Sequence, residues 1–239
     1  MQWSSEGLII GIKKHGETSV IVEAMVFNKG RHLGLVRGGR SAKKSPILQQ
    51  GNSVKLEWRA RLEDHLGVYN IELIKPRAAE LIADKKRLYL SALLCEYLRL
   101  LPERYTHDEL LGGVLNLLDE EQSEHELAIE LAKFELRLLE ELGFGLDIFS
   151  CALSGETEGL SHVSPRTGRA VTLREAKPYI DKLLPLPDFF TTPKTHTEIS
   201  KNDIKNAFKL TQHFFSMHIY LPRQINPPSN HENLLKILL

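Results

Sequence analysis

The stretch SVIVEAMVFNKGRHLGLVR, residues 19–37, decides the first half of the fold. Apolar side chains occupy every second position from Val20 to Val26, which is the period of a strand with one buried face. Asn28-Lys29-Gly30 then fits a tight turn, and a second apolar run follows from His32. The stretch therefore predicts a β-hairpin.

Similar short runs lie on both sides of this hairpin. We expect strands at residues 7–13, 19–27, 32–37, 53–61 and 67–74, with a further tight turn at His15-Gly16-Glu17. Five short strands, without a helix long enough to cover an open sheet, favour a small closed barrel. The OB fold is such a barrel, and it is a frequent platform for single-stranded nucleic acid.

The pattern changes at Pro76, after which apolar residues recur at helical spacing. Three pairs, Thr106 with Glu109, Ser123 with Glu126 and Ser200 with Asp203, predict capped helix starts. Gly143 and Gly145 are expected to end the helix that begins at Ser123. We therefore predict an α+β protein with two domains, a barrel at residues 1–77 and a helical domain at residues 78–239, the latter interrupted by an irregular insert at about residues 149–171.

Charge is distributed unevenly along a chain whose net charge is zero. Residues 1–80 hold 13 Lys and Arg against 8 Asp and Glu, and between Lys29 and Arg61 nine basic residues face one acid, Glu57. Such a local field suits a polyanion, because each contacted phosphate releases counterions. If the basic loop at residues 38–46 folds over the charged face of the fourth strand, a continuous groove results. The candidate phosphate contacts are Arg31, Arg37, Arg40, Lys43, Lys44, Arg59 and Arg61.

Aromatic residues on the predicted strands could stack on bases or fill the barrel core. The candidates are Trp3, Phe27, Trp58 and Tyr69, and the sequence leaves both alternatives open. In the helical domain, an amphipathic groove with basic flanks would accept a short hydrophobic and acidic peptide. The candidate flanks are Lys133, Arg137, Lys205 and Lys209, which could equally be ordinary solvated residues.

The sequence contains no pattern typical of catalysis. We find no phosphate-binding P-loop, no nucleophile elbow, and no cluster of carboxylates, histidines or cysteines at metal-binding spacing, so we expect neither an enzyme nor a metal site. The two cysteines, the absence of a long apolar run and the lack of a signal-peptide pattern at the N-terminus predict a reduced cytoplasmic protein with no membrane contact. A DNA-binding protein, an RNA-binding module and a scaffold for an acidic protein all remain compatible with these features.

Several segments together resemble one family. They are the Gly7-Leu8-Ile9-Ile10-Gly11 strand, the turn at residues 15–19, Lys29-Gly30-Arg31-His32, the run at residues 35–40, and downstream the segments at residues 142–147, 151–155 and after Ser200. In order and spacing they resemble the RecO family of bacterial DNA-repair mediators, over nearly the whole chain. The insert at residues 163–171 is similar to the form found in alphaproteobacterial members.

The resemblance implies an N-terminal OB fold, a helical domain and a non-catalytic function. It implies binding of single- and double-stranded DNA, annealing of complementary strands, engagement of RecR and of the C-terminal tail of the single-strand-binding protein, and help in loading RecA. It places this work in the cytoplasm, on the nucleoid during repair. It supports Arg37 and Arg40 most directly as DNA contacts.

One departure from the family concerns zinc. Many members carry a four-cysteine zinc site in the insert, whereas here Cys151 stands at the first position, Ser154 at the second, and no cysteine follows. One thiolate does not make a structural zinc site. We therefore predict a zinc-finger-like insert without its metal.

Overall fold

A computed structural model describes residues 1–192 and 195–239 of the chain. The chain forms two compact units, Met1–Asp119 and Glu120–Leu239. The first unit contains the barrel and also the three helices that follow it. The division into domains after residue 77 stays a prediction.

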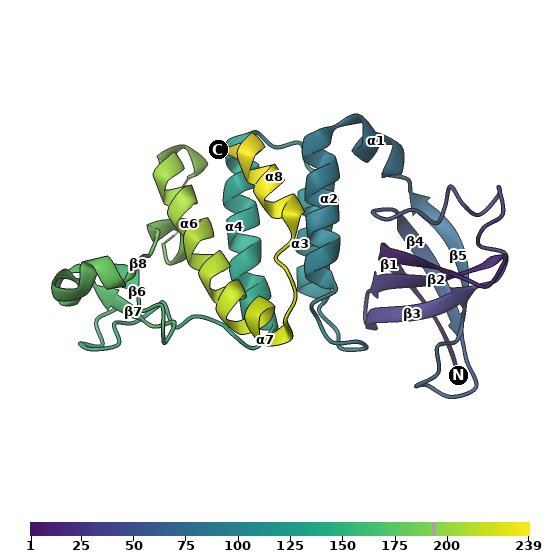
Figure 1. Ribbon diagram of the computed structural model, residues 1–239, viewed down its shortest axis with the longest axis horizontal. Helices are drawn as coiled ribbons and strands as arrows, with labels where there is room; N and C mark the ends of the chain where they lie inside the picture. The colour runs from purple at the N-terminus through teal and green to yellow at the C-terminus, as the bar shows by residue number, and fades with distance from the viewer. Residues whose placement is uncertain (193–194) are drawn as a thin grey trace. The chain divides into compact units, whose positions relative to one another are not determined.

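Five strands close into the barrel (Figure 1): β1 (Gln2–His15), β2 (Ser19–Val26), β3 (Gly30–Val36), β4 (Ser53–Arg59) and β5 (Val68–Lys75). Their order around the barrel is β1, β2, β3, β5, β4. All neighbours are antiparallel except β3 and β5, which pair in parallel at Leu35 and Val68. This is the partly Greek-key order of an OB fold, and the predicted α+β class is confirmed.

The predicted alternation sets which side chains fill the barrel. Val20, Val22, Ala24 and Val26 all point into the core. Trp58 and Tyr69 are buried beside them, with 1 % and 2 % of their surface exposed. The stacking alternative for these two aromatic residues is therefore excluded.

The other aromatic candidates lie at the edge of this core. Trp3 is half-buried and stacks on Trp58 with 5.8 Å between ring centroids. Phe27 is also half-buried. Direct base stacking on the barrel thus has little exposed aromatic surface available.

Three helices complete the first unit: α1 (Ala78–Ala83), α2 (Lys85–Leu98) and α3 (Asp108–Asp119). α2 contacts β1 and α3 contacts β2. On the outer face of β2, Glu23 pairs with Arg99, which follows α2, at 2.8 Å and with Arg31 of β3 at 2.6 Å. The helices therefore cover part of the β2–β3 face, which many OB folds use for oligonucleotides.

The predicted cap at Thr106 is wrong, because α3 begins later, at Asp108. The segment before the helix reaches back to the barrel, where the N–H of Arg104 donates to the carbonyl of Arg31 at 2.9 Å. The first helical hydrogen bond is accepted by His107, from the N–H of Leu111. The helix thus begins one residue later than a cap at Thr106 would place it.

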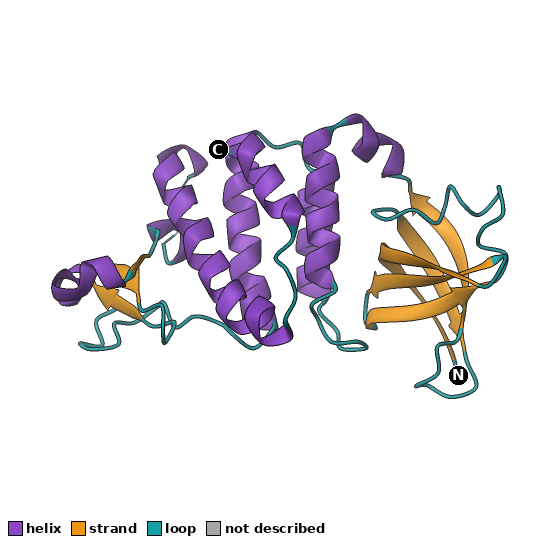
Figure 2. Ribbon diagram, viewed as in Figure 1, coloured by secondary structure: helices purple, strands orange, loops and turns teal. Residues whose placement is uncertain are grey.

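The second unit is built on α4 (Glu124–Glu141), which packs against α6 (Lys201–Phe215) and α8 (Ser229–Leu238), as Figure 2 shows. The fully buried Glu135 of α4 accepts a hydrogen bond from Thr211 of α6 and pairs with His231 of α8 at 2.9 Å. Between α6 and α8 the chain passes through the π-helical turn η4 (Ser216–Tyr220) and α7 (Leu221–Arg223).

The capping boxes at Ser123 with Glu126 and at Ser200 with Asp203 are confirmed. Gly143 follows the end of α4 with a φ of 85°, so a left-handed residue ends this helix as predicted.

The insert is longer and more regular than predicted. A three-stranded sheet forms from β7 (Ala170–Thr172), β6 (Leu160–Val163) and β8 (Leu184–Pro185), with α5 (Leu173–Ala176) and η1 (Lys177–Lys182) between β7 and β8. Two short 3-10 turns, η2 (Asp188–Phe190) and η3 (His196–Glu198), lead to α6. Strands of two to four residues are too short to show a period in the sequence.

No helix in the described residues is long and apolar enough to cross a membrane.

Candidate nucleic-acid interface

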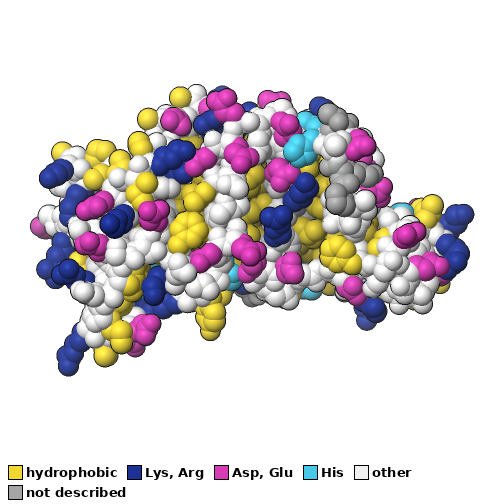
Figure 3. Space-filling view, turned by 180° about the vertical axis from the view of Figure 1, so that it is seen from behind, with side chains coloured by type: hydrophobic (Ala, Val, Ile, Leu, Met, Phe, Trp, Pro, Cys, Tyr) yellow, Lys and Arg dark blue, Asp and Glu magenta, His cyan; other side chains and the backbone are white. Residues whose placement is uncertain are grey.

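Six basic side chains gather where the β1–β2 turn meets the β3–β4 loop. We call them the basic rim: Lys13, Lys14, Arg37, Arg40, Lys43 and Lys44. Hydrogen bonds join the two segments, because the N–H of Arg40 donates to the carbonyl of Thr18 at 3.0 Å and its guanidinium to the carbonyl of Glu17 at 2.6 Å. Figure 3 shows several Lys and Arg side chains along the left edge of the view, over the barrel.

The β3–β4 loop is folded tightly. Gly38 has a φ of 62°, and a Cβ at Gly39 would lie 2.5 Å from the side chain of Val20, so this glycine lets the loop lie directly on the barrel. The ammonium of Lys44 donates to the carbonyl of Arg37 at 2.8 Å. Further along the loop, Leu48 is buried in the barrel core.

A buried polar network fixes the far end of the loop. The Asn52 side chain donates to the carbonyls of Pro46 and Ile47 and accepts from the N–H of Arg77 at 2.8 Å. Arg77, with 3 % of its surface exposed, pairs with Asp119 at 2.6 Å. Burial would raise the pKa of the Asp119 carboxyl, but Arg77 and Lys75 outweigh it and lower that pKa.

The rim side chains are available to a ligand. All are exposed except Lys44, which is partly buried. In the part of the chain that the structure describes, no carboxylate forms an ion pair with any of the six. Unopposed positive charge on a fixed backbone is what phosphate binding requires.

The other predicted contacts lie outside the β3–β4 loop. Arg31 is largely buried and held by Glu23 at 2.6 Å and Glu103 at 3.5 Å. Arg59 ends β4, where its neighbours across the sheet are Gln2 and Val68. Arg61 is exposed in the β4–β5 loop.

The continuous groove expected over the fourth strand does not form as predicted. The neighbours of β4 are β1 and β5, whereas the side-chain and backbone hydrogen bonds of Arg40 run to the β1–β2 turn. Lys55 on the outer face of β4 lies between Glu6 and Glu72 on the neighbouring strands. These two glutamates thus balance part of the positive charge that the sequence predicted on the outer face of β4.

Sequence reasoning missed Lys13 and Lys14. They directly precede the predicted turn at His15-Gly16-Glu17. The predicted hairpin could have located them, because it pairs Lys14 with Val20, which in turn pairs with Val36 at the end of β3.

A separate pocket of about 680 Å³ lies in the second unit. Lys133 and Arg137 of α4 line it beside apolar groups from α4, from the segment after α4 and from η2. They are Leu136, Leu146, Ile148, Phe149, Phe189 and Phe190. Phe149 has 65 % of its surface exposed. Lys205 and Lys209 lie on the exposed face of α6 and do not line this pocket.

The insert holds one buried cysteine, Cys151. The N–H of Ser154 lies 3.5 Å from the Cys151 sulfur, so a hydrogen bond occupies the thiol. Across residues 1–192 and 195–239, no three His, Cys, Asp or Glu side chains gather as a metal site. The absence of zinc stays a prediction.

Comparisons with known proteins identify the class. Residues 1–77 match the family described as "Recombination protein O N terminal", and residues 83–224 match "Recombination protein O C terminal". These matches place the chain among the recombination proteins.

Full-length relatives narrow the class to one family. The chain is 45 % identical to the DNA repair protein RecO of Chelativorans sp. (strain BNC1), over 100 % of this chain and 96 % of that protein. It is 44 % identical to the DNA repair protein RecO of Bradyrhizobium diazoefficiens, over 93 % and 89 %, and to that of Mesorhizobium japonicum, over 100 % and 94 %. The chain belongs to the RecO family.

Proposed function

We propose that this protein is a non-catalytic mediator of DNA strand annealing, within the DNA repair and recombination role that its family indicates. It would bind single- and double-stranded DNA, work with RecR, and help to load RecA onto strands coated by the single-strand-binding protein. We place this work in the cytoplasm, on the nucleoid, and without a bound metal.

The basic rim is the observation that supports this proposal. Six basic side chains that form no ion pair within the described residues, four on the loop that Asn52 and Arg77 fix and two on β1, can bind phosphates along one strand. Backbone contacts carry no sequence information and leave base edges free. A complementary strand can then pair with the held one while the rim screens the repulsion between the two.

The pocket of the second unit supports a contact with a protein partner. Its apolar lining and two basic side chains, Lys133 and Arg137, complement a short peptide that carries both aspartates and aromatic residues. The family resemblance implies one partner with this chemistry, the hydrophobic and acidic tail of the single-strand-binding protein. We therefore propose this pocket as the site for that tail.

Replacement of Arg37, Arg40, Lys43 and Lys44 together by Ala tests the DNA-binding proposal. We expect weaker binding to all DNA sequences alike, and a salt dependence whose slope falls by about 0.7 per lost contact on single strands and about 0.9 on duplex. Fluorescence anisotropy over a range of salt concentrations measures both quantities. Strand annealing should slow in parallel.

A matched pair of single variants separates the rim from general charge. Lys43→Ala should weaken binding, whereas Lys55→Ala, on a strand face balanced by Glu6 and Glu72, should change it much less. Equal effects would place the site elsewhere on the barrel. A large preference for RNA over single-stranded DNA of the same sequence would favour an RNA-binding module instead.

A further inference from the structure

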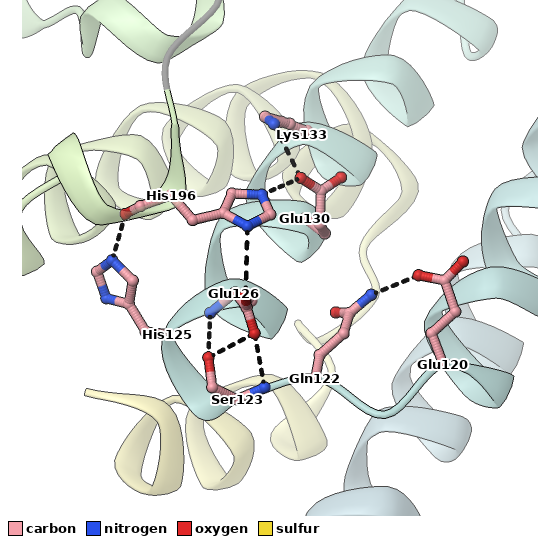
Figure 4. Close-up of polar contacts among 8 residues, drawn as sticks. All are labelled: Glu120, Gln122, Ser123, His125, Glu126, Glu130, Lys133 and His196. Carbon is pink, nitrogen blue, oxygen red and sulfur yellow. Dashed lines mark hydrogen bonds and ion pairs between the residues drawn. The ribbon is translucent and has the colours of Figure 1, made fainter.

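A histidine, two glutamates and a lysine form a chain of contacts beside the pocket (Figure 4). The Nε2 atom of His196 lies 3.1 Å from Oε1 of Glu130, and Nζ of Lys133 lies 2.8 Å from the same oxygen. The other ring nitrogen of His196 lies 3.6 Å from Glu126. Glu130 is thus shared between a titratable ring and a permanent cation.

This series of contacts ends at the pocket. Lys133 is one of the two basic residues that line it, and Thr191 and Thr192, which precede η3 in the sequence, line it as well. His196 itself lies in η3 and is held to α4 a second time, because its carbonyl is 2.9 Å from the ring of His125. His196 is therefore joined to α4 through its backbone carbonyl, and its ring contacts the carboxylate that pairs with the pocket residue Lys133.

We propose that Glu130 restrains Lys133 and that protonation of His196 releases it, so that the pair controls how strongly the pocket binds an acidic peptide. This inference rests on the peptide site proposed above and specifies how that site is regulated. When His196 is neutral, the Glu130 carboxylate is neutralised by Lys133 alone. When His196 is charged, it shares the carboxylate, and Lys133 can pair with an aspartate of the ligand.

Charged groups of both signs surround His196. Glu126 and Glu130 of α4 lie at its two ring nitrogens, Lys133 shares the Glu130 carboxylate, and His125 contacts its carbonyl. The carboxylate of Glu198, in the same turn as His196, accepts hydrogen bonds from the N–H and hydroxyl of the N-cap residue Thr195. Burial would raise the pKa of the Glu130 carboxyl, but hydrogen bonds from Lys133 and His196 outweigh it and lower that pKa. Glu130 therefore stays an anion in both charge states of the histidine, and histidine is the type of side chain whose charge generally changes between about pH 5 and 8.

The test uses a fluorescent peptide of four aspartates followed by two phenylalanines, bound to the full chain. At about pH 8, Glu130→Gln should bind this peptide about three- to fivefold more tightly than the wild type, the range that one half-exposed ion pair supports. Towards about pH 6 the wild type should gain affinity by a similar factor. His196→Gln and Glu130→Gln should both lose most of this dependence on pH.

Glu126→Gln is the matched control at about pH 8. It removes one negative charge from the same helix, keeps a side chain that suits the capping box, and leaves Lys133 paired. An equal gain in affinity from Glu126→Gln would mean a general field effect and would overturn the inference.

A second readout does not depend on the peptide. In NMR spectra the side-chain amine resonance of Lys133 should shift as His196 titrates in the wild type, and should not follow it in Glu130→Gln. Absence of this coupling overturns the inference whether or not the peptide binds. If the coupling is present and Lys133→Ala leaves peptide affinity unchanged, the proposed peptide site fails while the restraint of Lys133 stands.

Discussion

His32 is a titratable residue inside the aromatic part of the barrel. Its ring centroid lies 5.0 Å from that of Trp3 and 5.1 Å from that of Trp58, both edge to face, and its Nδ1 atom lies 3.0 Å from the hydroxyl of Tyr69. Burial first, and then the charges of Arg104 and Lys29, lower the pKa of His32 to about 4. The native barrel therefore holds a neutral histidine.

This histidine predicts an acid sensitivity of the first unit. The unfolded state binds a proton to His32 near pH 6.5 and the native state only near pH 4, so stability is lost as pH falls between these values, by at most about 3 kcal/mol. Both tryptophans of the chain lie in the barrel, so tryptophan fluorescence during urea unfolding reports on this unit. The His32→Gln variant should show a flatter dependence on pH; an unchanged one would assign the acid sensitivity to other groups.

Charge counting predicted the site only in part. Arg37, Arg40, Lys43 and Lys44 are adjacent in sequence and form one surface because a short loop keeps them together. Arg31 has the same charge, yet it is paired with Glu23, a residue whose position opposite β3 depends on strand pairing. The sequence shows how many charged residues exist, but only the register of the strands shows which basic side chains lie beside an acidic one.

At the scale of elements, the two confirmed capping boxes should be worth measurable stability. Ser123→Ala and Ser200→Ala each remove an oxygen that accepts from the N–H three residues on, and each should destabilise the second unit by about 1 kcal/mol. Denaturant unfolding followed by circular dichroism measures the change. Thr106→Ala is the control, because α3 begins after it at Asp108, and a loss of similar size there would contradict this assignment.

The β3–β4 loop depends on one amide side chain. Asn52→Ala removes the donor to the carbonyls of Pro46 and Ile47 and the acceptor for Arg77, all at buried or partly buried positions. Unsatisfied groups of this kind predict a loss of about 2 to 4 kcal/mol and a looser loop. Limited trypsin digestion should then cut faster at Lys43 and Lys44.

Gln49→Ala provides the comparison for this experiment. Gln49 is exposed and makes one local hydrogen bond to the carbonyl of Ser45. Its removal should leave both the stability and the rate of cleavage close to the wild type. Equal cleavage of the two variants would show that Asn52 does not fix the loop.

Elements differed in how well the sequence predicted them. β2, β3 and β4 have seven or eight residues and a clear burial period of two, and their ends were predicted to within two residues. β1 begins at Gln2, five residues before its predicted start. β6, β7 and β8 have four, three and two residues and left no period to detect. The parallel pairing of β3 with β5 puts β5 between β3 and β4 in the barrel. It joins strands that are not consecutive in the sequence, so no local sequence pattern predicts it.

On the scale of the whole molecule, the two units have opposite charge. Met1–Asp119 holds 18 Lys and Arg against 14 Asp and Glu, and Glu120–Leu239 holds 13 against 17. The basic rim belongs to the first unit and the pocket with Lys133 and Arg137 to the second. Each proposed ligand therefore has a surface contained within one unit.

This separation predicts that DNA and peptide binding can be removed independently. The rim variant with Ala at Arg37, Arg40, Lys43 and Lys44 should keep the wild-type affinity for the acidic peptide, and Lys133→Ala with Arg137→Ala should keep the wild-type affinity for DNA. With all six residues replaced, the loss of DNA-binding free energy should equal that of the rim variant, and the loss of peptide-binding free energy should equal that of the pocket variant. Both should agree within about 0.5 kcal/mol, as expected for sites without shared partners. Titrations of both ligands against all four proteins measure this. A larger deviation would mean that the two surfaces are energetically coupled, so that a change at one alters binding at the other.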